Sequence, residues 1–154
     1  MTGGARGIGR AMVRRFAAGG MRVVVADVDG ELAAEAAREV AGLGMAVDVR
    51  RIADVERLRD AALEAYGRVD LVCNNAGVTT SGRIRDLSLD EWRWILEVNL
   101  WGVIHGVHTF LPVLEANPEG GHLVNTASGA GLAPAWANAP YGVSKYGIVG
   151  LSEI

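Results

Sequence analysis

Two residues near the carboxyl end of the chain, Tyr141 and Lys145, combine side-chain types and a spacing that suit proton transfer. They lie four positions apart in a segment with helical character, so their side chains share one face of a helix. A phenol, with a pKa of about 10, is a poor base at neutral pH, but a nearby ammonium group favours the phenolate. The pair therefore predicts general acid–base chemistry, although Tyr-x-x-x-Lys by itself also arises by chance.

Two further polar residues stand out. Ser128 follows a predicted strand at 122–127 and precedes Tyr141 by thirteen residues. Asn99 lies between two apolar residues of a long predicted helix, where a polar side chain is unexpected on a packing surface. No Gly-x-Ser-x-Gly elbow surrounds Ser128, which disfavours a role as a hydrolase nucleophile.

A glycine-rich segment at 2–9 opens the first predicted helix. Its glycines permit a tight turn and leave room for a pyrophosphate at the helix N-terminus, where free N–H groups and the helix dipole favour anions. Asp27 lies eighteen residues past Gly9, at the end of a valine-rich strand, where a carboxylate can accept both ribose hydroxyls. These features predict a dinucleotide site, and on them alone an ordinary loop followed by a solvated aspartate stays open.

Asp27 and Arg6 favour different cofactors. A carboxylate repels a 2′-phosphate by about 1 kcal/mol or more, so Asp27 favours NAD over NADP. Arg6, in the glycine segment, is able to pair with a 2′-phosphate and favours NADP. We give Asp27 the greater weight, because it would lie at the ribose hydroxyl itself, and predict NAD with NADP as the alternative.

The hydrophobic pattern alternates between strand-like and helical segments. The predicted strands span 21–26, 45–47, 69–73 and 122–127, and their valine-rich runs are typical of buried parallel strands. The predicted helices span 7–18, 31–41, a stretch through 55–63, 89–114 and a last segment from about 140. Ser88-Leu89-Asp90-Glu91 has the form of a capping box for the long helix. This alternation predicts an α/β fold with a parallel sheet.

Composition narrows the class of protein. The 154 residues are 50% hydrophobic and 21% charged with a net charge of −3, which suits a single soluble domain over 1–154. No long basic run indicates a nucleic-acid partner, and the apolar runs are too short for a membrane span. Cys73 is the lone cysteine and no secretory leader is evident, so we predict a cytoplasmic protein. His105 and His108 lack an evident third ligand, so no metal site is predicted.

Jointly, these segments resemble the short-chain dehydrogenase/reductase family. The resemblance rests on Thr-Gly-x-x-x-Gly-Ile-Gly at 2–9, Asn-Asn-Ala-Gly at 74–77, Asn99, Ser128 and Tyr141-x-x-x-Lys145. The motifs are collinear with the family over essentially the whole chain. The resemblance implies a doubly wound Rossmann sheet, and hydride exchange between a nicotinamide cofactor and a secondary alcohol or ketone.

The resemblance also implies a role for each matching residue. Tyr141 would be the general acid/base, and Ser128 would orient the substrate oxygen. Lys145 would bind the nicotinamide ribose and tune Tyr141, while Asn99 would hold a water in the proton relay. The implied cofactor contacts, besides Asp27, Tyr141 and Lys145, are Gly3, Arg6, Gly7, Ile8, Gly9, Asp48, Val49, Asn75, Ala76 and Gly77.

Two other functions stay open. A dinucleotide-binding sensor without turnover would not need the complete set of four polar residues. A sugar-nucleotide epimerase or dehydratase shares Tyr-x-x-x-Lys, but the glycine spacing and the Asn-Asn-Ala-Gly segment speak against it. Trp92, Trp94 and Trp101 do not share one helix face, and the family's association through this helix implies a homo-oligomer in the full-length form.

The pattern departs from the family at both ends. Only Met1 and Thr2 precede Gly3, so the first strand is expected to be missing and the strands at 21–26 and 69–73 to flank a vacant position. Ile154 falls inside the last predicted helix, and the family's last two strands have no counterpart. We therefore expect an incomplete Rossmann domain, a fragment of a longer enzyme that is poorly soluble and inactive by itself.

Overall fold

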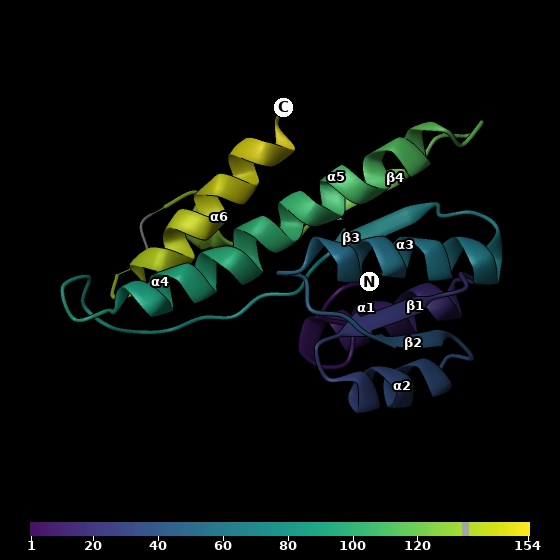
Figure 1. Cartoon of the computed structure of the whole chain (residues 1–154), viewed down its shortest axis with the longest axis horizontal. Helices are drawn as coiled ribbons and strands as arrows, with labels where there is room; N and C mark the ends of the chain where they lie inside the picture. Colours follow the sequence, from purple (N-terminus) through teal and green to yellow (C-terminus); the bar gives the residue numbers. More distant parts are fainter. Residues whose placement is uncertain (134–135) are drawn as a thin grey trace.

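The computed structural model describes residues 1–133 and 136–154 (Figure 1). The helices are α1 (Gly7–Ala18), α2 (Gly30–Arg38), α3 (Ile52–Tyr66), α4 (Leu89–Leu96), α5 (Gly102–Glu115) and α6 (Ala139–Ser152). The strands are β1 (Val24–Asp27), β2 (Leu43–Ala46), β3 (Leu71–Asn74) and β4 (His122–Asn125). A π-helix, η1 (Glu97–Trp101), joins α4 to α5, and a 3-10 turn, η2 (Gly129–Gly131), follows β4. The predicted alternation of strands and helices is confirmed.

The strands are parallel and form two pairs, with the first residues of the chain between them. β1 pairs with β2, and β3 pairs with β4. Thr2 forms a parallel bridge with Ala26 of β1, and its backbone N–H donates to the carbonyl of Cys73 in β3 at 3.1 Å. The order is therefore β2, β1, residues 1–2, β3, β4. This is a partial, doubly wound Rossmann arrangement, as predicted.

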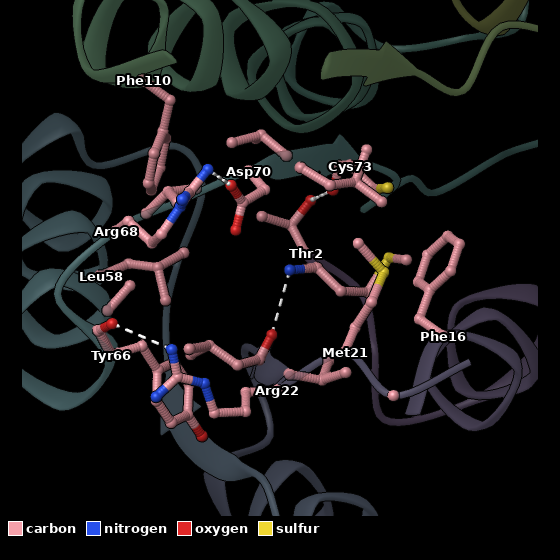
Figure 2. A pocket seen from close by; sticks show the side chains of 18 residues that line it. Thr2, Phe16, Met21, Arg22, Leu58, Tyr66, Arg68, Asp70, Cys73 and Phe110 are labelled. Atoms are coloured by element: carbon pink, nitrogen blue, oxygen red, sulfur yellow. Dashed lines mark hydrogen bonds and ion pairs between the residues drawn. The ribbon is translucent and has the colours of Figure 1, made fainter. Parts of the chain in front are cut away.

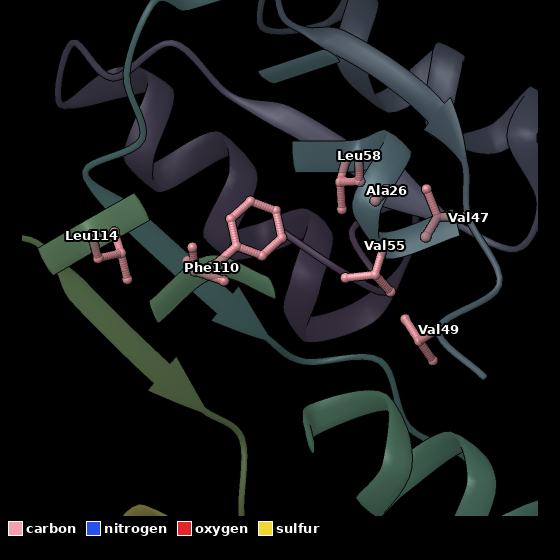
Figure 3. Close-up of a cluster of buried hydrophobic side chains, with 8 residues drawn as sticks. Ala26, Val47, Val49, Val55, Leu58, Phe110 and Leu114 are labelled. Carbon is pink, nitrogen blue, oxygen red and sulfur yellow. The ribbon is translucent and has the colours of Figure 1, made fainter. Parts of the chain in front are cut away.

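Helices cover both faces of the strands and enclose two apolar clusters. On one face, α1 and α2 pack against β1, with Val13 and Val25 fully buried. On the other face, α3 and α5 contribute Leu58 and Phe110 to a cluster that contains Ala26 (Figure 3). Successive residues of a strand point to opposite faces, so β1 must be apolar at consecutive positions to serve both clusters.

The long helix predicted over 89–114 is interrupted. Its start is as expected, because the Ser88 Oγ accepts the Glu91 N–H at 3.2 Å and the Glu91 carboxylate accepts the Ser88 N–H at 2.8 Å. The π-helix η1 then separates α4 from α5 and contains Asn99. The prediction of one continuous α-helix is wrong there, because a π-turn inserts a residue that hydrophobic periodicity does not reveal.

Several boundaries differ from the predictions: β2, β3 and β4 span 43–46, 71–74 and 122–125 instead of 45–47, 69–73 and 122–127. β1 begins at Val24, because residues 19–21 form the turn that follows α1. α2 ends at Arg38, and Ala41, at φ +51°, turns the chain toward β2. α6 ends at Ser152, so Ile154 lies beyond the helix that was predicted to contain it. Within residues 1–133 and 136–154, the structure has no helix long and apolar enough to cross a membrane.

A cavity of about 360 Å³ lies between β1 and β3 (Figure 2). Phe16, Leu58 and Phe110 line it together with residues of both strands. Met1 borders it, with its amino group donating to the Val24 carbonyl at 3.0 Å. The strand position predicted to be vacant is therefore partly filled, because Met1 and Thr2 occupy one part of it.

Candidate functional site

The glycine-rich segment folds back on itself at the start of α1. Gly3 and Gly7 have φ values of +61° and +52°, a left-handed conformation that glycine adopts at little cost. A Cβ atom on Gly9 would lie 2.0 Å from the carbonyl oxygen of Gly3, so the turn closes only without a side chain there. The motif thus has a steric basis in this chain.

The first turn of α1 fits an anion. Arg6 occupies the N-cap position without capping through its side chain, and the first turn holds no acidic residue. In α2 and α4, by contrast, the side chains of Asp29 and Ser88 accept hydrogen bonds from first-turn N–H groups. The free N–H groups at a helix start carry partial positive charge, so this end of α1 fits a phosphate.

Asp27 stands at the end of β1, beside the glycine segment. Its carboxylate accepts backbone N–H groups from Ala5 at 3.1 Å and from Asp29 at 3.3 Å. Arg6, the candidate ligand of a 2′-phosphate, pairs with the Asp29 carboxylate at 3.2 Å. The one arginine of the glycine segment is thus engaged by an acid, whereas Asp27 is held by uncharged donors.

Asp48 and Val49 follow β2 and are fixed from two directions. The Asp48 N–H donates to the buried Asp54 carboxylate at 3.1 Å. The Arg50 guanidinium donates hydrogen bonds of 2.6 to 3.1 Å to the Asp48 carboxylate, and these hydrogen bonds lower the pKa of Asp48. The Val49 carbonyl contacts Nδ1 of His105 in α5 at 2.8 Å. Arg50 therefore belongs to the loop that lines the site.

His105 and His108, the pair considered for a metal site, lie on α5. The His105 ring lies 5.9 Å from that of Trp101, and His108 is exposed on the same helix. In the part of the chain that the structure describes, no three histidine, cysteine or acidic side chains are grouped so as to hold a metal ion.

Asn75, Ala76 and Gly77 follow β3 and are tied to the start of the chain. The Thr2 Oγ1 accepts the N–H groups of Asn75 at 3.0 Å and Ala76 at 3.1 Å. The Asn75 side-chain amide donates to the Gly3 carbonyl at 3.2 Å. The glycine segment and the loop after β3 therefore form one continuous wall.

Tyr141 and Lys145 lie in the first turns of α6. The Lys145 Nζ is 5.5 Å from the centre of the Tyr141 ring and donates to the Thr126 carbonyl at 2.6 Å. Lys145 is almost fully buried, and this desolvation lowers the pKa of its ammonium group. The Ser128 Oγ accepts the Ala130 N–H at 3.2 Å, which fixes its side chain at the start of η2. A phenol, an amine and a hydroxyl thus line one cleft, as acid–base chemistry requires.

Asn99 lies behind this group. Its side chain is fully buried, its Oδ1 accepts the Val78 N–H at 2.8 Å, and its Nδ2 donates to the Val78 carbonyl at 2.9 Å. Asn99 therefore holds the segment that follows Gly77 against the helix.

One cleft of about 940 Å³ brings the predicted residues together, and every predicted site residue except Asn99 lines it. It lies at the carboxyl ends of β1, β3 and β4, where the strand order reverses, the usual ligand position in such sheets. The motifs alone did not predict several of the residues that line the cleft. Most of these residues lie next to a motif in the sequence, and that position is the only sign that could have identified them. They include Val28, Arg50, Val78, Thr79, Trp94, Val98 and Thr126.

Comparison with known proteins agrees with this geometry. The sequence model of the short chain dehydrogenase family matches residues 1–154. The chain is 35% identical to 3beta-hydroxysteroid dehydrogenase 2 of Eggerthella lenta, over 99% of this chain and 61% of that protein. It is 38% identical to meso-2,3-butanediol dehydrogenase of Serratia marcescens, again over 99% and 61%.

A solved structure is also similar. The crystal structure of a short chain dehydrogenase/reductase from Burkholderia phymatum, in complex with NAD, matches with a TM-score of 0.96 and 42% identity. The match covers 99% of this chain and 56% of that one. The chain therefore spans about three fifths of the length of these relatives.

Proposed function

The chain belongs to the short-chain dehydrogenase family, and from that premise we propose that the protein transfers a hydride between a nicotinamide cofactor and a secondary alcohol or ketone. One observation carries the proposal. Tyr141, Lys145 and Ser128 line the same cleft as the open start of α1 and Asp27. Acid–base residues and a nucleotide site in one cleft are what such a reaction needs.

The cleft residues fit a dinucleotide. The free N–H groups at the start of α1 would bind the pyrophosphate, and Asp27 would accept the ribose hydroxyls. Asp48 and Val49 would contact the adenine, and Lys145 the nicotinamide ribose. The remaining contacts would come from Arg6, Ile8, Asn75, Ala76 and Gly77, all in the cleft lining. When bound, the nicotinamide supplies or accepts the hydride.

Tyr141 would move the proton. In alcohol oxidation its phenolate removes the hydroxyl proton, and in ketone reduction its hydroxyl returns a proton to the oxygen. The Lys145 ammonium favours the phenolate, and Ser128 orients the substrate oxygen by a hydrogen bond. Asn99 would hold a relay water through its backbone, because both hydrogens of its side-chain amide are already engaged.

We favour NAD over NADP. Asp27 would repel a 2′-phosphate, and Arg6 is paired with Asp29. The Burkholderia phymatum relative, solved in complex with NAD, supports this choice. The names of the curated relatives, a hydroxysteroid and a butanediol dehydrogenase, support secondary alcohols as the substrate class.

We also propose that copies of the chain associate. Trp101, Leu111 and Tyr146 expose 53%, 42% and 46% of their surface on the helices η1, α5 and α6. Large exposed apolar side chains of this kind commonly mark subunit contacts. The other proposed partner is a small-molecule substrate. The cytoplasm remains the proposed compartment, because the lone Cys73 has no cysteine to pair with.

The test is a hydride-transfer assay on the natural full-length protein. A panel of secondary alcohols and ketones is offered with each nicotinamide cofactor, and the reduced cofactor is followed by absorbance. Turnover of at least one substrate pair is expected. Tight nucleotide binding without turnover across the panel would support the sensor alternative instead. Interconversion of sugar nucleotides with retained cofactor would support an epimerase.

A further inference from the structure

Ser144 is a buried hydroxyl to which the proposed mechanism gives no task. It lies on α6 between Tyr141 and Lys145, with none of its surface exposed. Its Oγ donates to the Tyr141 carbonyl at 2.7 Å and accepts a hydrogen bond from the Asn99 Nδ2 at 3.2 Å. A hydroxyl has one proton to donate, so Ser144 acts as the donor in one of these bonds and as the acceptor in the other.

Asn99 continues the connection to the cofactor wall. Its amide is bonded to both the N–H and the carbonyl of Val78, which directly follows Gly77. An unbroken series of hydrogen bonds therefore runs from the loop after β3, through Asn99 and Ser144, to the Tyr141 backbone. Each member except Tyr141 and the Val78 loop is fully buried, so water does not compete for these bonds.

We propose that Ser144 is a positioning residue for the reaction inferred above. It fixes the first turn of α6, and with it the Tyr141 ring, relative to the loop at 75–78 that lines the cofactor cleft. This inference rests on the proposed function. Ser144 acts through Asn99 and the Tyr141 backbone, since it is absent from the cleft lining.

α6 packs against α4, η1 and η2, and within this packing two side chains bond it to opposite sides of the cleft. Lys145 ties α6 to the strand side of the cleft through the Thr126 carbonyl. Ser144 makes the second bond, on the η1 side. Catalysis depends on this placement, because a displacement of about 1 Å at the reacting atoms can cost about a hundredfold in rate.

The same helix offers a matched control. The Ser152 Oγ donates to the Ile148 carbonyl at 2.7 Å and accepts a hydrogen bond from the Asn125 Nδ2 at 3.0 Å. Ser152 therefore makes the same two kinds of bond as Ser144, but at the other end of α6 and away from Asn99. Ser152→Ala removes a hydroxyl with the same two kinds of bond at an exposed position, and it leaves the series of bonds to Tyr141 intact.

The experiment compares Ser144→Ala with Ser152→Ala in the natural full-length protein. It measures kcat, the dissociation constant of NADH, and the pH dependence of kcat. We expect Ser144→Ala to lower kcat about tenfold and to weaken NADH binding several-fold. The midpoint of its pH profile should move to higher pH, because Lys145 no longer stays at a fixed distance from the phenol. Ser152→Ala should keep wild-type values.

A double variant isolates the route. If Ser144 acts through Asn99, then Ser144→Ala should cost little further activity in an Asn99→Ala background. Additive losses would overturn the proposed route. So would a Ser144→Ala protein that melts at a lower temperature but keeps the wild-type kcat and pH profile, because that result describes a purely structural serine.

The experiment also gives an answer if the alanine variant does not fold or if the wild type is inactive. Should the alanine variant fail to fold, Ser144→Cys replaces the hydroxyl by a weakly donating thiol and gives the same comparison. A wild type that transfers no hydride overturns the proposed function and this inference with it. If the wild type is active and Ser144→Ala has the same kcat, NADH affinity and pH profile, the inference about Ser144 is overturned and the proposed function stands.

Discussion

The acidic residues in and beside the cleft differ in what holds them. Asp29 is paired with Arg6, and Asp48 with Arg50. Asp27 is bonded instead to two backbone N–H groups. Neutral donors hold a carboxylate in place without cancelling its charge, so Asp27 keeps its repulsion toward a second anion. We therefore expect Asp27, more than its neighbours, to set the choice between the two nicotinamide cofactors.

Replacing Asp27 tests this expectation. Asp27→Ala should lower the ratio of kcat/KM with NAD to kcat/KM with NADP by about fivefold or more, since repulsion of about 1 kcal/mol is removed. A companion variant, Asp29→Asn, keeps an oxygen that can cap α2 but releases Arg6, and should raise kcat/KM with NADP alone. A wild-type protein that already prefers NADP would contradict the weight given to Asp27.

Tyr141 gives a second prediction at this scale. Tyr141→Phe keeps the ring beside Lys145 and removes only the hydroxyl. Turnover should fall by about a hundredfold or more, because general acid–base catalysis typically contributes at least that much. The dissociation constant of NADH, measured by fluorescence titration, should stay near the wild-type value. Residual activity above about a tenth of wild type would refute the assignment.

Elements differ in how far the sequence predicts them. The start of α4 was predictable, because a capping box is local chemistry between Ser88 and Glu91. The π-helix at Asn99 was not, because apolar spacing looks nearly the same with one residue inserted. The residues that line the cleft were largely predictable from motifs, whereas Ser144 was not. A serine on a helix carries no signal until its partners across the fold are known.

The contact between α1 and α2 has a pH dependence. The Glu39 carboxylate at the end of α2 accepts hydrogen bonds from Arg10 and Arg14 of α1, and these lower its pKa from 4.5 to about 2. A carboxylate with a lowered pKa stabilises the fold above pH 4.5 and loses that contribution as the pH falls toward 2.

Glu39→Gln tests this sign. At neutral pH and low salt, the variant should unfold at a lower temperature than the wild type, and the difference should shrink steadily between pH 4.5 and 2. Added salt should also shrink it, since the pair is on the surface. Glu64→Gln, at an exposed position of α3, is the control and should change little at any pH. If the unfolding temperatures of Glu39→Gln and the wild type still differ below pH 2, the lowered pKa of Glu39 is not the cause of the difference.

At the scale of the molecule, the first residues of the chain lie between the two strand pairs and bond to both. Residues 1–4 pair with Val24 and Ala26 of β1 and with Cys73 of β3, and the cavity lies beside the earlier part of both strands. Each buried backbone group left without a partner costs about 1–3 kcal/mol, and a domain's margin is about 5–15 kcal/mol. A few such groups are enough to remove most of that margin.

The 154-residue polypeptide, produced by itself, should therefore be poorly soluble and inactive. Size-exclusion chromatography and the hydride-transfer assay measure both properties. Aggregation without turnover is the expected result. A folded, monodisperse 154-residue protein that oxidises alcohols would refute this prediction.

The bonds of Thr2 have a consequence for how the protein folds. Thr2 contacts Cys73, Asn75 and Ala76, from 71 to 74 positions along the chain. Closing so long a loop costs entropy, and contacts of high sequence separation slow folding. During synthesis, residues 1–4 emerge long before the end of β3, so they must wait for their partners. The contacts of residues 1–4 with β1 and β3 are thus among the last to form, and the cleft, which residues from both strand pairs line, is completed with them.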